Sequence, residues 1–215
     1  MQDFVVVVDM QQDFVLPTGA LAVQGADRLI GPMQRWLSEL KAGDTAGVLF
    51  TFDTHDPAAY ADSPESTQFP LHCVRDSHGW NSVLDWQAVA AGIPVYRLEK
   101  SVFAMWEEPA LLLQDMRAPQ TPGVERDPFF AVLKAQGVCR VIVVGVAADF
   151  CVRWAIDGLV ERGFGVVIPE KMTKGIARNI QEVVADEFGN ASVMIDLSTT
   201  GFCCHGMKNL TPANR

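Results

Sequence analysis

The chain has 215 residues, of which 49% are hydrophobic and 20% are charged, and its formal net charge is −9. This length can bury one large core, so we expect a single domain over residues 1–215, with a core (1–200) and a C-terminal tail (201–215). The acidic balance and the scattered lysines and arginines argue against nucleic acid or an anionic membrane as a partner.

The predicted elements alternate between strands and helices along the chain. Short apolar runs rich in Val, Ile and Phe predict strands over residues 4–8, 46–52, 93–99, 140–146, 164–170 and 191–197. Segments of helical periodicity predict helices over residues 27–43, 80–92, 127–137, 148–163 and 175–189. Asp127 and Pro128 have the residue types of a helix cap and first turn. This alternation predicts an α/β fold, a three-layer α/β/α domain around a six-stranded, mostly parallel, doubly wound sheet.

Two long segments interrupt the alternation. The first, Thr54–Gly79, is rich in turn residues and holds three of the four histidines, and loops of this length tend to carry function. The second, Ser101–Glu125, contains Phe103, Trp106 and Leu111–Leu113, and we interpret it as a lid or a subunit contact. These apolar side chains meet either another subunit or the protein's own core, and we expect a homo-oligomer.

The cysteines and the N-terminus favour a cytoplasmic protein. The five cysteines are odd in number and irregularly spaced, which favours reduced thiols over a disulfide framework. They are Cys73, Cys139, Cys151, Cys203 and Cys204. The N-terminal apolar run is too short for a signal peptide, and no later stretch reaches the roughly 18 apolar residues of a membrane span.

Polar residues with catalytic potential follow four of the predicted strands. Asp9 ends the first strand, and Asp53 ends the second, with His55 two residues later. Lys100 ends the third strand, and Cys151 lies in the first turn of the helix after the fourth. Because functional sites in doubly wound sheets form at the carboxyl ends of the strands, we expect these side chains to converge.

Asp9, Lys100 and Cys151 form a coherent set for a cysteine hydrolase. A helix N-terminus and a neighbouring ammonium group both favour the thiolate. A carboxylate can take the thiol proton and later deliver it to a leaving amine, while free N–H groups at the helix start can hold an oxyanion. The plainer interpretation is that Cys151 packs in the core beside an ordinary Asp9–Lys100 ion pair, but four coincident strand ends favour catalysis.

The long histidine-rich loop holds residues of metal-ligand type. Asp53 and His55 lie on the same side of an extended segment, and Glu65 and His72 follow in the loop. Two imidazoles and two carboxylates suit Zn²⁺, Fe²⁺ or Mn²⁺. On spacing alone, a packing role for His72 and a solvated charge at Glu65 fit equally well.

Five motifs together resemble the isochorismatase-like cysteine hydrolases, and within them the nicotinamidase/pyrazinamidase branch. The motifs are VVVVDMQQDF, FTFDTHD, FPLHC, LEK and GVAADFCV, in order from Val5 to about Val193. The resemblance implies the strand order 3-2-1-4-5-6. It also implies that Asp9 is the general base and acid, that Lys100 completes the triad, and that Cys151 is the nucleophile.

Further roles follow from the same resemblance. It implies a cis peptide bond between Val146 and Ala147, with the N–H groups of Ala147 and Cys151 as the oxyanion hole. It implies a divalent metal, with zinc favoured over iron or manganese, and no organic cofactor. The implied metal ligands are Asp53, His55, Glu65 and His72. Phe14 and Phe103 correspond in sequence to aromatic residues that flank the substrate ring in that branch. Tyr60 lies near the sequence position at which some nicotinamidases have a third histidine.

The expected function is therefore hydrolysis of a small-molecule amide, nicotinamide, to nicotinate and ammonia. The first alternative is a relative that acts on a non-pyridine amide or a ureido compound, in which the loop histidines are structural. The second alternative is a non-catalytic interaction protein on the same fold, which the presence of all three triad residues disfavours. The segment after Lys100 does not resemble the usual nicotinamidase sequence, so the substrate is the least determined part of this prediction.

Overall fold

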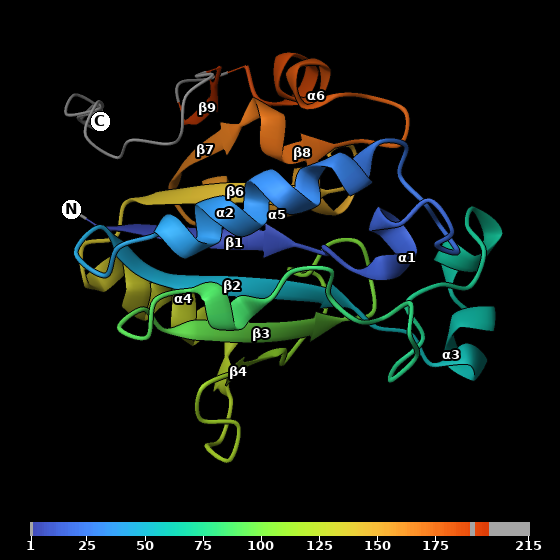
Figure 1. Cartoon of the computed structure of the whole chain (residues 1–215), viewed down its shortest axis with the longest axis horizontal. Helices are drawn as coiled ribbons and strands as arrows, with labels where there is room; N and C mark the ends of the chain where they lie inside the picture. The colour runs from blue at the N-terminus through green and yellow to red at the C-terminus, as the bar shows by residue number, and fades with distance from the viewer. Residues whose placement is uncertain (1, 190–191, 198–215) are drawn as a thin grey trace.

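A nine-stranded, mostly parallel β-sheet runs through the computed structural model, which describes residues 2–189 and 192–197 (Figure 1). The strands are β1 (Asp3–Val8), β2 (Thr45–Asp53), β3 (Val95–Lys100), β4 (Leu112–Asp115), β5 (Val124–Glu125), β6 (Arg140–Val146), β7 (Gly165–Pro169), β8 (Thr173–Lys174) and β9 (Val193–Asp196). They are ordered β5-β4-β3-β2-β1-β6-β7-β9, and β8 pairs with β6. The six long parallel strands have the order β3-β2-β1-β6-β7-β9, which confirms the predicted topology.

Helices cover both faces of the sheet. The α-helices are α1 (Gln12–Val15), α2 (Ile30–Glu39), α3 (Pro57–Ala61), α4 (Arg126–Ala135), α5 (Cys151–Glu161) and α6 (Ile180–Glu187). Short 3₁₀ segments occur at Ala26–Leu29, Pro64–Thr67, Trp86–Ala88 and Glu170–Met172. The apolar faces of α4, α5 and α6 pack on one side of the sheet, and α2 packs on the other (Figure 1).

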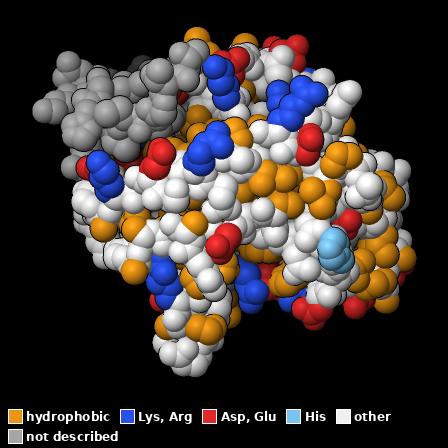
Figure 2. All heavy atoms as spheres, in the orientation of Figure 1, with side chains coloured by type: hydrophobic (Ala, Val, Ile, Leu, Met, Phe, Trp, Pro, Cys, Tyr) orange, Lys and Arg blue, Asp and Glu red, His pale blue; other side chains and the backbone are white. Residues whose placement is uncertain are grey.

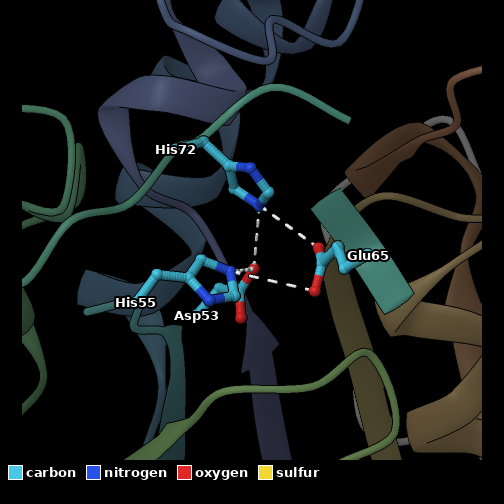
Figure 3. Close-up of side chains that lie close together, drawn as sticks. All are labelled: Asp53, His55, Glu65 and His72. Atoms are coloured by element: carbon cyan, nitrogen blue, oxygen red, sulfur yellow. Dashed lines mark hydrogen bonds and ion pairs between the residues drawn. The ribbon is translucent and has the colours of Figure 1, made fainter. Parts of the chain in front are cut away.

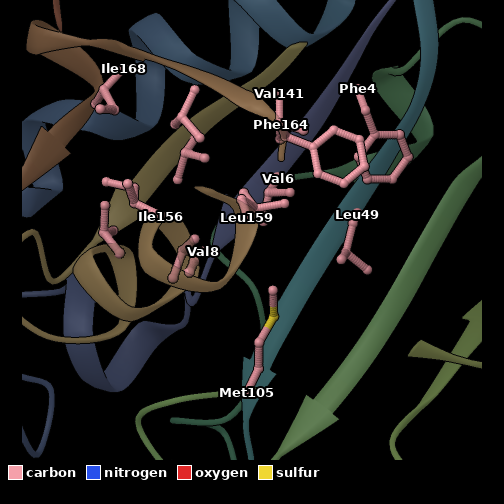
Figure 4. Close-up of a cluster of buried hydrophobic side chains, with 14 of the residues drawn as sticks. Phe4, Val6, Val8, Leu49, Met105, Val141, Ile156, Leu159, Phe164 and Ile168 are labelled. Carbon is pink, nitrogen blue, oxygen red and sulfur yellow. The ribbon is translucent and has the colours of Figure 1, made fainter. Parts of the chain in front are cut away.

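The valine run of β1 explains why this strand is central. Phe4, Val6 and Val8 point into the core under α4 and α5, where Figure 4 shows Val6 and Val8 near Leu159 and Phe4 near Phe164. Val5 and Val7 point into the opposite core, under α2. Side chains alternate between the two faces of a strand, so a strand covered by helices on both sides must be apolar throughout.

The prediction of a helix over residues 80–92 is wrong, because Trp86–Ala88 is the only helical part of this segment and is a single 3₁₀ turn. The start of this segment pairs with the chain just after β1 instead. Gln12 N donates to Asn81 O at 2.9 Å, and Val83 N donates to Met10 O at 2.8 Å. These backbone bonds and the burial of apolar side chains below α2 stabilise an extended course that local periodicity did not reveal.

The segment Ser101–Glu125 forms two strands that the sequence analysis missed. β4 pairs antiparallel with β3, and β5 pairs antiparallel with β4, so they extend the sheet beyond the predicted six strands. Phe103, Trp106 and Leu113 pack against the chain's own core. The apolar residues of this segment therefore have an intramolecular explanation, and the homo-oligomer stays a prediction.

Four helix starts differ from those predicted, since α2 begins at Ile30 and α6 at Ile180, three and five residues after their predicted starts, and α4 and α5 also differ. The residue before α4 is Glu125, and Asp127 lies in the first turn, where its carboxylate pairs with Arg126 and Arg162, so it is not the cap. α5 begins at Cys151, three residues later than the periodicity predicts. The later start brings the cysteine to the first position of the helix.

Acidic and basic side chains are interspersed over the face drawn in Figure 2, and they do not form a continuous basic patch there. None of the helices among the described residues has the length and apolar character needed to cross a lipid bilayer. The tail predicted at residues 201–215, with Cys203 and Cys204, lies outside the described residues.

Candidate active site

Three predicted catalytic residues meet at the carboxyl edge of the sheet. Asp9 directly follows β1, Lys100 is the last residue of β3, and Cys151 is the first residue of α5. Lys100 Nζ lies 2.9 Å from Asp9 Oδ2 and 3.5 Å from Cys151 Sγ. All three are buried, with exposed fractions of 0%, 2% and 6% for Asp9, Lys100 and Cys151. The arrangement places a base, an ammonium group and a thiol within direct contact.

The surroundings of Lys100 and Cys151 shift their pKa values in the same direction. Burial lowers the pKa of Lys100, but the carboxylates of Asp53 and Asp9 outweigh it, so the pKa is well above its ordinary value and the ammonium stays charged. Burial raises the pKa of the Cys151 thiol; Lys100 opposes this rise, while Asp9 and Asp53 reinforce it. Lys100 thus acts in the predicted direction, but burial and the two carboxylates outweigh it, and the pKa of the Cys151 thiol lies above its ordinary value.

Thr51, which the sequence analysis missed, fixes the Asp9 carboxylate. Thr51 Oγ1 donates a 2.6 Å hydrogen bond to Asp9 Oδ1 and accepts one of 3.2 Å from Asp9 N. It is a polar residue in the otherwise apolar run of β2, two positions before Asp53, and that break in the pattern is the signal that could have identified it. Asp9 itself has a positive φ of 46°, which turns its side chain away from the strand geometry.

The backbone before α5 presents N–H groups beside the thiol. The Val146–Ala147 peptide bond is cis. The carbonyl oxygen of Ala147 accepts from Phe150 N and Val152 N, at 3.0 and 3.1 Å. Cys151 N is one of the first N–H groups of the helix, which have no acceptor within the helix itself. Ala147 and Cys151, the two residues predicted to form the oxyanion hole, both line the same small cavity.

A second cluster of four buried residues lies next to the first (Figure 3). It contains Asp53 at the end of β2, His55 two residues later, Glu65 in a 3₁₀ turn and His72 in the loop that follows. Nε2 of His55 and Nε2 of His72 lie 3.2 and 3.1 Å from Asp53 Oδ2. Glu65 approaches from the other side, with Oε1 3.4 Å from His72 Nε2 and Oε2 3.9 Å from His55 Nε2.

The donor set of this cluster fits a divalent cation. Each residue offers one ligand atom, and these atoms lie within 4.8 Å of one another. Glu65 Oε1 is buried and has no hydrogen bond among the described residues. Nδ1 of His72 lies 2.7 Å from the carbonyl oxygen of Pro70, a contact that assigns its proton to Nδ1 and leaves Nε2 free to act as a ligand. Burial lowers the pKa of His72, but the carboxylates of Asp53 and Glu65 raise it to about 10, so a cation that binds Nε2 would displace a proton from it.

Tyr60 packs on this cluster without joining it. Its ring lies against those of His55 and His72, with centroids 4.6 and 5.6 Å away. Its hydroxyl points away and donates to the carbonyl oxygens of Phe69 and Pro70, at 3.0 and 3.1 Å. Burial and the charges of neighbouring carboxylates raise the pKa of Tyr60 to about 12, so it stays a neutral donor. Tyr60 is thus hydrogen-bonded to the backbone of the loop that carries His72.

Asp53 connects the two clusters. Its Oδ2 faces both histidines, while its Oδ1 lies 3.3 Å from Lys100 Nζ. Burial raises the pKa of Asp53, but Lys100 and the hydrogen bonds with the two histidines outweigh it and hold the pKa well below its ordinary value. Gln11, which the sequence analysis also missed, fixes the backbone here, since its side-chain amide bonds both N and O of Asp53 at 2.8 Å.

Both clusters face one narrow cavity. It is lined by Phe14, Leu21, Asp53, Glu65, Phe69, Phe103, Ala147, Phe150, Cys151 and Ile176, and its volume is about 20 Å³. Phe14 and Phe103, the two aromatic residues that the resemblance implies, are among these lining residues, while Phe69 and Phe150 were not predicted. Phe69, Phe103 and Phe150 contact one another, with centroids 5.2 to 5.9 Å apart. A bound aromatic ring requires these side chains to move apart.

A doubly wound sheet with a buried cysteine, aspartate and lysine at its carboxyl edge defines the class of this protein, an α/β hydrolytic enzyme. The chain belongs to the isochorismatase family. The family model described as the isochorismatase domain matches residues 3–197, which is nearly all of the described chain.

Two curated relatives are amidohydrolases. The nicotinamidase/pyrazinamidase of Mycobacterium tuberculosis is 28% identical over 201 residues, covering 90% of this chain and 98% of the relative. The ureidoacrylate amidohydrolase RutB of Methylobacterium radiotolerans is 27% identical over 193 residues, covering 83% of this chain and 72% of the relative. The chain is therefore a member of the isochorismatase family that is similar to a nicotinamidase/pyrazinamidase over nearly its whole length.

Solved structures agree with this assignment. The pyrazinamidase of Pyrococcus horikoshii in complex with zinc has a TM-score of 0.66 and 26% identity, covering 91% of this chain and 99% of that one. PnC1 from L. infantum in complex with nicotinate has a TM-score of 0.64 and 25% identity, covering 90% and 91% of the two chains. The three-layer fold of this chain is thus shared over almost its whole length.

Proposed function

We propose that this enzyme is a metal-dependent nicotinamidase, which hydrolyses nicotinamide to nicotinate and ammonia through a Cys-Asp-Lys triad. One observation carries the proposal: the narrow cavity is lined both by the thiol of Cys151 and by the carboxylates of Asp53 and Glu65 from the four-residue cluster. A substrate that carries its carboxamide on a nitrogen-containing aromatic ring could meet both groups at once. The similarity to a nicotinamidase/pyrazinamidase over 98% of that protein supports the same substrate class.

The first step is proton transfer from Cys151 to Asp9. The raised pKa of the thiol keeps its proton on the sulfur, and the neighbouring Asp9 carboxylate, whose charge contributes to that rise, is the base that takes it. Lys100, in contact with both groups, holds the carboxylate and stabilises the thiolate as it forms. The thiolate then attacks the carboxamide carbon, and a carbon–sulfur bond forms.

The second step releases ammonia. The negative charge that develops on the carboxamide oxygen is stabilised by the N–H groups of Ala147 and Cys151. Asp9 returns its proton to the amide nitrogen, the carbon–nitrogen bond breaks, and a thioester on Cys151 remains. Asp9 then takes a proton from water, the hydroxide attacks the thioester, the carbon–sulfur bond breaks to release the acid, and Asp9 returns the proton to the sulfur of Cys151.

The four-residue cluster and the aromatic side chains orient the substrate. A divalent cation held by Asp53, His55, Glu65 and His72, with zinc favoured, would supply a Lewis acid that binds the ring nitrogen. Phe14 and Phe103 line the cavity and would contact the faces of the ring.

A ureido substrate is the second candidate. The observation that favours it is the relative of 27% identity, which is a ureidoacrylate amidohydrolase. The triad chemistry is the same for both substrates, since each requires attack on a carbonyl carbon attached to nitrogen. The role of the four-residue cluster differs between the two substrates, because a ureido acid has no ring nitrogen that a cation in the cluster could bind.

The test is ammonia release from nicotinamide, pyrazinamide, benzamide and a ureido acid, measured with and without a chelator, together with the metal content of the purified enzyme. We expect turnover of the two substrates with a ring nitrogen, loss of that turnover with the chelator, and near-stoichiometric zinc, iron or manganese. Preferential, chelator-insensitive turnover of the ureido acid would establish the second candidate. Activity of Cys151→Ala towards any of the four would overturn the triad.

A further inference from the structure

Asp149, in the turn before Cys151, binds a second loop, residues 175–178, beside the cavity. Asp149 lies two residues before Cys151, and its carboxylate accepts hydrogen bonds from three successive backbone N–H groups. The N–H of Ile176 donates to Oδ1 at 2.8 Å, and those of Ala177 and Arg178 donate to Oδ2 at 2.7 and 2.9 Å. Asp149 is only 8% exposed, so these charge-assisted bonds are sheltered from water.

The loop, residues 175–178, can adopt this course only with a small residue at its start. A Cβ on Gly175 would lie 1.8 Å from the carbonyl oxygen of Arg178 and 2.9 Å from Asp149 Oδ1. A further backbone bond, from Ala148 N to Lys174 O at 2.8 Å, joins the same two segments. The guanidinium of Arg178 is turned to Glu187, so the Asp149 carboxylate is bound by the backbone of the loop.

Ile176 is the side chain that this loop places at the cavity. It lines the narrow cavity together with Ala147 and Cys151. It also lines a separate open groove of about 560 Å³, formed by residues 170–182. Ile176 is 42% exposed, so part of its side chain faces solvent on the groove side. It therefore forms the wall between the cavity that contains the thiol and a much larger space outside.

We propose that Ile176 limits the size of the acyl group that the enzyme accepts, and that Asp149 is the positioning residue that holds this wall beside Cys151. The inference rests on the proposed amide hydrolysis at Cys151 and adds a determinant of specificity to it. Substrates are restricted to small planar amides because the wall closes the path into the groove. Neither residue takes part in the proton transfers.

The experiment compares kcat/KM for nicotinamide with kcat/KM for its methyl- and phenyl-substituted derivatives, each ring position substituted in turn. In Ile176→Ala, the ratio of the best substituted amide to nicotinamide should rise about tenfold or more, since a missing methylene in an apolar pocket already changes discrimination to that extent. Leu112→Ala removes an exposed leucine from β4 and should leave the ratio unchanged. An unchanged ratio in Ile176→Ala overturns the proposal.

Asp149→Asn tests the positioning role. The amide keeps the shape of the carboxylate but presents an NH₂ group to at least one of the loop N–H groups, so the loop loses part of its anchor. We expect the size ratio to rise as in Ile176→Ala, with a higher KM for nicotinamide and a smaller effect on kcat. A merely structural role would reduce the activity towards all the amides in parallel and leave the ratio as in the wild type.

The double variant Asp149→Asn/Ile176→Ala makes the test specific. If Asp149 acts through Ile176, adding Asp149→Asn to Ile176→Ala should not change the size ratio further. If the two substitutions change the ratio independently and multiplicatively, Asp149 does not act through Ile176. If Asp149→Asn fails to fold, Ile176→Ala alone still tests whether Ile176 limits the size of the substrate. A wild-type enzyme without turnover of nicotinamide would refute the proposed function instead, and the ratios would then be measured with aliphatic or ureido amides of increasing length.

Discussion

The Thr51 hydroxyl is the neutral group that fixes the proposed general base, and its removal tests the arrangement of the triad. Thr51 is 2% exposed, and its hydroxyl donates to Asp9 Oδ1 at 2.6 Å and accepts from Asp9 N at 3.2 Å. Thr51→Val keeps the branched shape and deletes both bonds. A hydrogen bond to a charged group contributes about 1.5–3 kcal/mol, and about 1.4 kcal/mol in the activation barrier is a tenfold change in rate. We therefore expect kcat to fall about 10- to 100-fold, with little change in KM.

The assay is steady-state ammonia release from nicotinamide, with thermal unfolding measured in parallel. Thr45→Val is the matched control, because Thr45 is also buried on β2 but lies six residues earlier, about 20 Å away. Thr51→Ser keeps the hydroxyl and should recover most of the lost rate. If Thr51→Val has the kcat of the wild type, Asp9 does not depend on this bond and the reasoning is refuted. A loss of kcat that Thr45→Val reproduces would refute it as well.

Three further predictions concern the thiol and the metal ligands. Cys151→Ala should release no ammonia while keeping the fold, and a measurable rate would exclude it as the nucleophile. Because burial and the charge of Asp9 raise the pKa of Cys151, its thiolate fraction is small at neutral pH, so alkylation by iodoacetamide should keep increasing above pH of about 9. Exposed Cys139 should react first, and peptide mass spectrometry distinguishes the two; full reaction of Cys151 at neutral pH would contradict the raised pKa. His72→Ala should lose the bound metal and raise the KM for nicotinamide, whereas His78→Ala, in the same loop but outside the cluster, should retain both.

Much of the sheet and the convergence of the triad could be predicted because both depend on local pattern. A strand buried on both faces must be apolar throughout, so the run Phe4–Val8 was recognisable without a structure. In a parallel sheet the carboxyl ends share one edge, so residues after separate strands, such as Asp9 and Lys100, were expected to meet. The distances of 2.9 and 3.5 Å from Lys100 to Asp9 and Cys151 agree with that reasoning.

The errors come from contacts between distant parts of the chain. The segment 80–92 has helical periodicity, but its hydrogen bonds with residues 10–13 stabilise an extended course. β4 and β5 are short, and they depend on pairing with the edge strand β3. The raised pKa of Cys151 follows from burial among carboxylates, which no local feature of the helix start reveals.

The sequence by itself determined the alternation of strands and helices, the residues at each strand end and, through their joint motifs, the family. These features follow from side-chain periodicity and from residue type, which are properties of the chain alone. Only the tertiary structure decided which groups hold the chemistry in place: Thr51 on Asp9, Asp53 between Lys100 and two histidines, and Asp149 on the loop of Ile176. Each is a short polar contact across many residues of sequence, and such contacts exist only once the sheet has brought the strand ends together.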